Sequence, residues 1–149
     1  MIGIKAMEIA ITQKGVTEKT NHNDGVDVGK YLKSVGLPEG YSWCMAFVYW
    51  CVQQAAVQLK VANPLKCTGG VLAQWNARPL LRVKDPLPGD IMILDYGKGL
   101  GHTGLVIAVD GLFVDTIEGN TNSGGSRDGD GVYTRRRKIK SAKGFLRMP

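Results

Sequence analysis

The first forty residues alternate between segments with helical spacing of apolar residues and polar or turn-forming segments. Apolar side chains recur near one helical face over 2–13, and Gly15 follows, which predicts a first helix. A second, shorter helix is predicted over 28–35, where Gly36 ends it. The polar residues 17–28 between them have the composition of an ordered loop.

The next segment, 41–51, is apolar on every side and contains neither proline nor glycine, and its helical pattern continues through residue 58. It follows a turn-rich stretch, so we predict a fully buried helix. Ser42 is the expected N-cap, which makes Cys44 the second helical residue. The free N–H groups and dipole at a helix start favour a thiolate and can stabilise an oxyanion. Taken alone, the pattern favours a structural core cysteine, so the rest of the chain must decide.

A short helix is predicted over 70–77, and after residue 80 the pattern changes to short apolar runs separated by turns. Strands are predicted, in order, over 91–94, 102–109, 112–118 and 132–139, with 145–148 packing at the end of the chain. Helices that come first and strands that come later predict an α+β fold, in which an antiparallel sheet packs against the buried central helix.

The turn between the two central strands decides which of their residues share a face. A two-residue loop would place His102 opposite Gly119 and leave Glu118 on the other face. A three-residue loop, with Gly111 in the left-handed conformation, would place His102 directly opposite Glu118, with β-carbons ~5 Å apart. Asn120 then follows on the same face two residues further on.

The three-residue loop brings together groups that suit acyl transfer. Cys44, His102 and Glu118 have the chemistry of a nucleophile, a base and a residue that orients the base. A strand histidine by itself is more often a hydrogen-bonded core residue, but this combination favours catalysis. The same face carries Gly104 and Ala108, which are small enough to let the buried helix approach closely.

Composition narrows the possible partners. The 149 residues fit one domain, 1–149, and the net charge of +6 favours an anionic partner such as nucleic acid, membrane or wall polymer. We interpret the basic run 135–140 as a solvated strand face more readily than as a nucleic-acid patch. Cys44, Cys51 and Cys67 cannot all pair and lack metal-binding spacing, which excludes a disulfide scaffold and a zinc knuckle.

Four short motifs resemble those of the CHAP domain, the cysteine- and histidine-dependent amidohydrolases/peptidases. In chain order they are Trp43-Cys44-Met45-Ala46-Phe47-Val48, Pro88-Gly89-Asp90-Ile91, Gly101-His102-Thr103-Gly104-Leu105-Val106 and Glu118-Gly119-Asn120. The resemblance implies a papain-like fold and hydrolysis of amide bonds in peptidoglycan, as in phage lysins and bacterial wall-remodelling enzymes. On that pattern Cys44 is the nucleophile, His102 the general base and later acid, Glu118 the orienting residue and Asn120 a further polar member.

The sequence also gives expectations about substrate and cofactor. Loops around Trp43, Trp75 and Tyr96 are expected to bind substrate and to choose between an N-acetylmuramoyl-L-alanine amide and a peptide bond. Some relatives bind calcium through acidic residues upstream of the cysteine. Here that region offers chiefly Asp24 and Asp27 among asparagines, so we expect no metal and no cofactor.

Two other functions remain open from the sequence. The same catalytic residues would also serve a cysteine amidase acting on a small soluble amide or γ-glutamyl substrate. A papain-like fold without activity would be a binding module that uses the basic run 135–140. The N-terminus lacks a leader pattern, and no apolar run reaches the ~20 residues of a membrane span. We therefore expect a monomer made in the cytoplasm that acts at the bacterial cell wall after lysis or assisted export.

Overall fold

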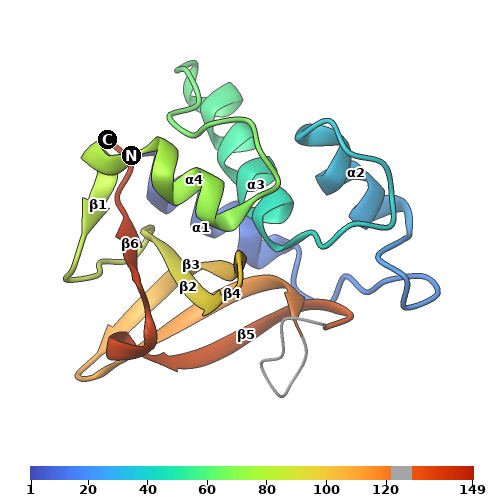
Figure 1. Ribbon diagram of the computed structural model, residues 1–149. Helices are drawn as coiled ribbons and strands as arrows, with labels where there is room; N and C mark the ends of the chain where they lie inside the picture. Colours follow the sequence, from blue (N-terminus) through green and yellow to red (C-terminus); the bar gives the residue numbers. More distant parts are fainter. Residues whose placement is uncertain (122–128) are drawn as a thin grey trace.

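Helices and strands occupy separate layers in the computed structural model, which describes residues 1–121 and 129–149. Within these residues, four α-helices gather on one side of a six-stranded antiparallel sheet (Figure 1). The helices are α1 (Ile2–Thr12), α2 (Val26–Ser34), α3 (Cys44–Leu59) and α4 (Val71–Ala77). The predicted α+β fold with a buried central helix is therefore confirmed.

The six strands all run antiparallel to their neighbours. They are β1 (Arg82–Val83), β2 (Ile91–Gly97), β3 (Leu100–Asp110), β4 (Phe113–Thr121), β5 (Gly131–Lys138) and β6 (Gly144–Leu146). Their order across the sheet is β1-β6-β2-β3-β4-β5, so the last strand of the chain lies between the first two. The strands β2 and β3 are longer than predicted, because pairing continues through the glycine-rich turn at 97–101.

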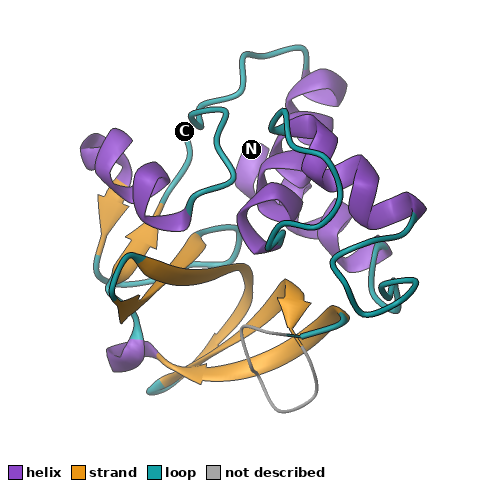
Figure 2. Ribbon diagram, turned by 45° about the vertical axis from the view of Figure 1, so that its right-hand side comes forward, coloured by secondary structure: helices purple, strands orange, loops and turns teal. Residues whose placement is uncertain are grey.

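The helix α3 is the centre of the larger core. It packs against α1, α2, β3 and β4, and most of its side chains are fully buried. Figure 2 shows the helices gathered above the curved sheet. Gly119 of β4 permits the close approach of α3, because a β-carbon there would lie 2.8 Å from the Phe47 Cβ. None of the described helices is both long and apolar enough to cross a membrane.

The two faces of the sheet bury different side chains. Leu105 and Ile117 belong to the core shared with the helices. A second, smaller core lies on the other face and is formed by Met92, Leu94, Val106, Val114 and Phe145. Because strand side chains alternate between faces, the face of Leu94 and Val106 is also that of His102 and Gly104. The site residues on β3 therefore belong to the side of the second core.

The hairpin between β3 and β4 has neither of the two predicted loops. Asp110 pairs with Phe113, so the turn consists of Gly111 and Leu112. Ile107 has no partner in β4, and the pairing shifts there, so that Leu105 lies opposite Ile117. Continuing this register by one residue places Glu118 across from Gly104, and a β-carbon on Gly104 would lie 2.5 Å from Cγ of Glu118. The predicted direct opposition of His102 and Glu118 is thus wrong, although the two residues do share a face.

Candidate active site

Cys44 is the first residue of α3, and the predicted cap needs correction. Trp43, with φ −122° and ψ 15°, is the N-cap, and no side chain caps the helix, so Ser42 does not have that role. The first helical hydrogen bond runs from the Phe47 N–H to the Trp43 carbonyl, at 2.9 Å. The N–H groups of Cys44 and the two residues after it precede this bond and have no acceptor within the helix.

The thiol of Cys44 lies beside the imidazole of His102. His102 lies near the start of β3. Its contact with Cys44 raises the pKa of the imidazole. The Nδ1 atom of His102 is buried and has no hydrogen-bond partner in the described part of the chain. Its Nε2 atom is 2.8 Å from Oε1 of Glu118. Nδ1 is therefore the ring nitrogen that remains for Cys44.

Glu118 is fully buried and accepts hydrogen bonds from three side chains. His102 binds Oε1, and the Thr116 hydroxyl donates to Oε2 at 2.6 Å. Arg137 of β5 donates to both oxygens, with Nε 2.9 Å from Oε2 and Nη2 2.5 Å from Oε1. Burial alone would raise the pKa of Glu118, but Arg137 and His102 outweigh it and lower the pKa to about 2. The carboxylate is ionised at neutral pH.

His102 has the opposite shift. Burial would lower its pKa, but the contacts with Cys44 and Glu118 outweigh this effect and raise the pKa from 6.5 to about 9. The imidazole is therefore protonated at neutral pH, and its Nε2–H donates to the Glu118 carboxylate. The imidazolium of His102 therefore lies between the thiol of Cys44 and the carboxylate of Glu118.

The glycines of β3 and β4 show which face meets the helices. A β-carbon on Gly104 would lie 2.5 Å from Cγ of Glu118, so this glycine makes room for the carboxylate. The prediction that Gly104 admits the central helix is therefore wrong. On the opposite face, a β-carbon on Gly101 would lie 2.9 Å from Val71 of α4. His102 and Glu118 thus lie on the face away from the helices, and Cys44 meets them at the end of the sheet.

Asn120 is buried near the end of β4, two residues after Glu118. Its backbone is left-handed, with φ 54°, and the pairing of β4 with β5 shifts between Glu118 and Thr121. The Oδ1 atom of Asn120 has no hydrogen-bond partner within the described residues. An irregular strand and an unpaired buried oxygen set Asn120 apart from ordinary strand residues.

The structure separates the three residues expected to bind substrate. Trp43 is fully buried, and its indole Nε1–H donates to Oε2 of Glu18 at 2.7 Å while its ring stacks on Tyr31. Its side chain is therefore part of the core and is not available to touch a substrate. Trp75 packs between Gly144 and the guanidinium of Arg82, which lies 4.4 Å above its ring.

Tyr96 is the one of the three that lies at the site. It is half-exposed near the end of β2. Burial raises the pKa of its hydroxyl, the charges of Glu118 and Cys44 act in the same direction, and Arg137 acts in the opposite direction. The side chain is positioned at the rim of the group formed by Cys44, His102 and Glu118.

The two aspartates upstream of Cys44, Asp24 and Asp27, already have partners close to them in the sequence. The Asp24 carboxylate accepts hydrogen bonds from the backbone and hydroxyl of Thr20, and Asp27 pairs with Lys30 at 3.1 Å. Within the described residues, no cluster of three or more histidine, cysteine or acidic side chains is arranged to hold a metal. That the protein needs no calcium stays a prediction.

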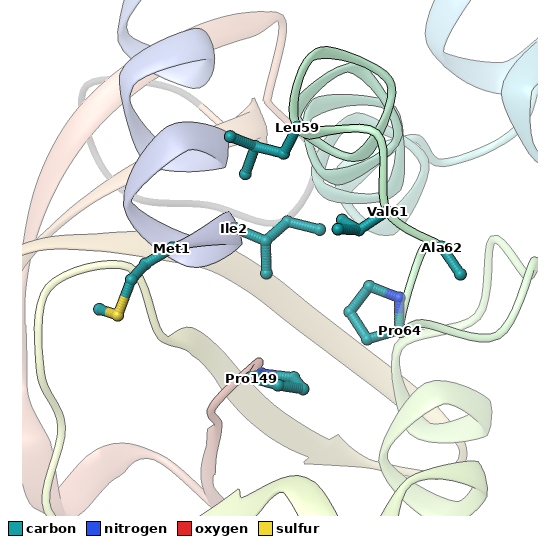
Figure 3. A pocket seen from close by; sticks show the side chains of 7 residues that line it. All are labelled: Met1, Ile2, Leu59, Val61, Ala62, Pro64 and Pro149. Atoms are coloured by element: carbon teal, nitrogen blue, oxygen red, sulfur yellow. The ribbon is translucent and has the colours of Figure 1, made fainter.

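A separate apolar cavity of about 350 Å³ lies where the ends of the chain meet, between the start of α1 and the end of α3. Figure 3 shows the side chains that line it, Met1, Ile2, Leu59, Val61, Ala62, Pro64 and Pro149. None of the predicted site residues is among them. The cavity is therefore distinct from the group around Cys44.

A thiol at a helix start, next to a histidine and a carboxylate held on strands, defines a papain-like arrangement on an α+β fold. Residues 36–120, more than half of the chain, match the CHAP domain family. The chain therefore belongs to the CHAP domain family, whose members are generally amidohydrolases and peptidases. Cys44, His102, Glu118 and Asn120 all fall within the matched residues, whereas Arg137 lies outside them.

A solved structure supports the fold independently. The chain resembles the crystal structure of Ly7917, with a TM-score of 0.56 and 18% sequence identity. The similarity covers 99% of this chain and 62% of that chain, so this chain spans less than two thirds of its length. Among curated protein sequences, none matches this chain at a significant level.

Arg137 and Thr116 are the site residues that sequence reasoning missed. The run 135–140 was interpreted as a solvated strand face, which is correct for its even-numbered strand positions only. Arg136 is exposed and pairs with Asp110 and Asp115, whereas Arg137 points to the face of Glu118. The alternation of β5 is the signal that could have found it, but only with the register of β4 and β5 known.

Proposed function

We propose that this domain hydrolyses amide bonds in bacterial peptidoglycan, with Cys44 as the nucleophile. The observation that carries the proposal is the row of contacts from Cys44 through His102 to a buried, ionised Glu118. Membership of the CHAP family supports the general reaction, and the net charge of +6 suits an anionic wall polymer. The bond is either the N-acetylmuramoyl-L-alanine amide or a peptide bond of the stem or cross-bridge.

The chemistry begins with the thiolate of Cys44. Its sulfur attacks the carbonyl carbon of the amide, and the N–H groups at the start of α3 stabilise the oxyanion. The protonated Nδ1 of His102 then gives its proton to the leaving amine as the carbon–nitrogen bond breaks. In the second half, His102 takes a proton from water, which attacks the thioester and restores the thiolate–imidazolium pair.

Glu118 and Asn120 have supporting roles in this proposal. Glu118 holds Nε2 of His102, so that Nδ1 remains directed at Cys44. The carboxylate also stabilises the imidazolium form. Asn120, whose buried Oδ1 has no hydrogen-bond partner among the described residues, is suited to accept a hydrogen bond from substrate or from the attacking water. Tyr96, half-exposed at the rim, is suited to contact the substrate beside the scissile bond.

Digestion of purified peptidoglycan, followed by mass spectrometry of the released fragments, tests the proposal and identifies the bond. We expect new amine and carboxyl ends from the wild-type domain. Cys44→Ala should lose roughly a thousandfold or more in rate, since the nucleophile is removed. Cys51→Ser in the buried core and Cys67→Ser on the surface are matched controls that should retain activity. Unchanged fragments from wild type, or full activity in Cys44→Ala, would refute the proposal.

The two other functions predict different outcomes of the same experiment. Activity on soluble γ-glutamyl amides without release from peptidoglycan would identify a small-molecule amidase. A binding module would leave both substrates intact and would bind anionic polymers in a salt-dependent manner. The ion pairs of Arg136 and Arg137 with acidic side chains neutralise part of the basic run and weigh against this last function.

A further inference from the structure

Arg137 lies directly behind Glu118 and completes a row of four charged groups. Its guanidinium binds both carboxylate oxygens, at 2.9 Å from Nε and 2.5 Å from Nη2. The Glu118 side chain has no exposed surface, and that of Arg137 is 15% exposed. A two-point contact of this kind fixes the orientation of a carboxylate as well as compensating its charge.

The four groups alternate in charge. When Cys44 is a thiolate and His102 an imidazolium, the row from Cys44 to Arg137 carries negative, positive, negative and positive charges, with a net charge of zero. Without Arg137, the row would carry one uncompensated negative charge at a position where His102 and Glu118 are fully buried. A buried charge without a partner is costly, so the row would then take up a proton more readily.

The hydrogen bonds of Glu118 also explain why its orientation depends on Arg137. The carboxylate accepts four of them, and two come from the guanidinium. The remaining donors, His102 and Thr116, contact one oxygen each. Without the guanidinium, each oxygen would keep a single hydrogen bond, so the orientation of the carboxylate would be held by two donors in place of four hydrogen bonds.

We propose that Arg137 is a positioning residue of the catalytic group, which holds the Glu118 carboxylate in the orientation that binds Nε2 of His102 and leaves Nδ1 for Cys44. The proposal rests on the proposed function of Cys44 and His102. Arg137 lies outside the residues that match the family, 36–120, and belongs to β5, a strand at the edge of the sheet. In addition to orienting Glu118, Arg137 keeps the buried row electrically neutral.

The neighbouring arginine supplies a matched control. Arg136 points to the opposite face of β5, where it binds Asp115 and Asp110, both at 3.0 Å. Its side chain is 48% exposed. Arg136→Gln therefore removes the same charge from the adjacent position without touching Glu118, and we expect wild-type kinetics from it.

Kinetics on the wall substrate test the catalytic part. Arg137→Gln should lower kcat roughly ten- to a hundredfold, the range for losing hydrogen bonds to a buried charged group, and leave KM unchanged. Arg137→Lys keeps the charge but not the two-point contact, so it should restore only part of kcat. In the plot of kcat against pH, the acid limb should move to higher pH in Arg137→Gln, because Arg137 lowers the pKa of Glu118. It should stay near its wild-type position in Arg137→Lys, which keeps the positive charge.

Nitrogen-15 NMR of the histidine rings tests the same role without any substrate. The chain has two histidines, so His22 serves as the internal reference for His102. The titratable groups that face His102 and Glu118 are Cys44 of α3, Tyr96 of β2 and Arg137 of β5. In wild type, the chemical shifts of the His102 ring nitrogens should not change through protonation of Glu118 until pH approaches 2, the pKa of that carboxylate. This change is the Glu118 transition.

The two measurements together decide the proposal. In Arg137→Gln the Glu118 transition should move to higher pH, whereas in Arg136→Gln it should not. If Arg137→Gln and Arg137→Lys both keep wild-type kcat and the wild-type acid transition, Arg137 has no positioning role. If Arg137→Gln does not fold, lowered kcat in a folded Arg137→Lys supports the role and unchanged kcat overturns it. If wild type does not cleave peptidoglycan, the proposed function fails while the NMR transition still decides whether Arg137 controls Glu118.

Discussion

Gly104→Ala tests whether the position of Glu118 controls activity. The new β-carbon would lie 2.5 Å from Cγ of Glu118, whereas ordinary van der Waals contacts begin at 3.4 Å. The carboxylate would have to withdraw by about 1 Å, and misplacement of this size can cost about a hundredfold in rate. We therefore expect kcat on peptidoglycan to fall roughly a hundredfold per folded molecule. Hydrolysis rates normalised to the folded fraction, from circular dichroism, measure this.

A second glycine, on the helix side of β4, provides the comparison for Gly104. In Gly119→Ala the new β-carbon would lie 2.8 Å from Phe47 and Trp43, on the face away from Glu118. Overpacking of this kind should lower the free energy of unfolding by about 1–3 kcal/mol in both variants. Only Gly104→Ala should also lose activity per folded molecule. If both variants keep wild-type kcat per folded molecule, the carboxylate does not need its observed position.

Three further predictions test other parts of the site and its support. The pKa of His102 is raised from 6.5 to about 9, so its contribution to stability is complete below pH 6.5 and is lost as pH rises through 9. Urea unfolding should therefore show the free energy of unfolding falling by about 3 kcal/mol over this range in wild type, and His102→Gln should lack that slope. Asp90→Asn weakens the two hydrogen bonds, 3.0 and 2.8 Å, that the buried carboxylate accepts from Arg147. The free energy of unfolding, measured with urea, should fall by about 1–3 kcal/mol. An unchanged free energy of unfolding would mean that the Asp90–Arg147 pair does not stabilise the fold. Tyr96→Ala should raise KM for peptidoglycan, while Trp75→Ala should leave KM unchanged, and the reverse order would place the substrate near α4.

Much of the site could be predicted because its chemistry is local in the sequence. Cys44 follows a turn and opens an apolar run, and this pattern is sufficient to predict a thiol at a helix start. The cap was wrong because the choice between Ser42 and Trp43 depends on backbone angles that several sequences permit. Trp43 was assigned to the substrate because burial of an aromatic ring depends on distant residues, here Glu18.

The charged run on β5 shows a different limit. Alternation along a strand predicts two faces, but the sequence does not show which face is buried until the neighbouring strand is placed. Arg137 and Arg136 have the same chemistry and adjacent positions. Only the pairing of β4 with β5 distinguishes the arginine that holds Glu118 from the one that binds surface carboxylates.

The shared face of His102 and Glu118 depends on one residue that no sequence pattern identifies. If the pairing of Asp110 with Phe113 continued unchanged along the hairpin, Glu118 would lie opposite Leu105, on the side of the helices. The unpaired Ile107 shifts the pairing by one, and this places Glu118 on the side of His102. Isoleucine is a common strand residue, so nothing about residue 107 predicts an irregularity. The carboxylate reaches the histidine because the two-residue turn alone would place Glu118 on the helix side, and the shift at Ile107 moves it to the other face.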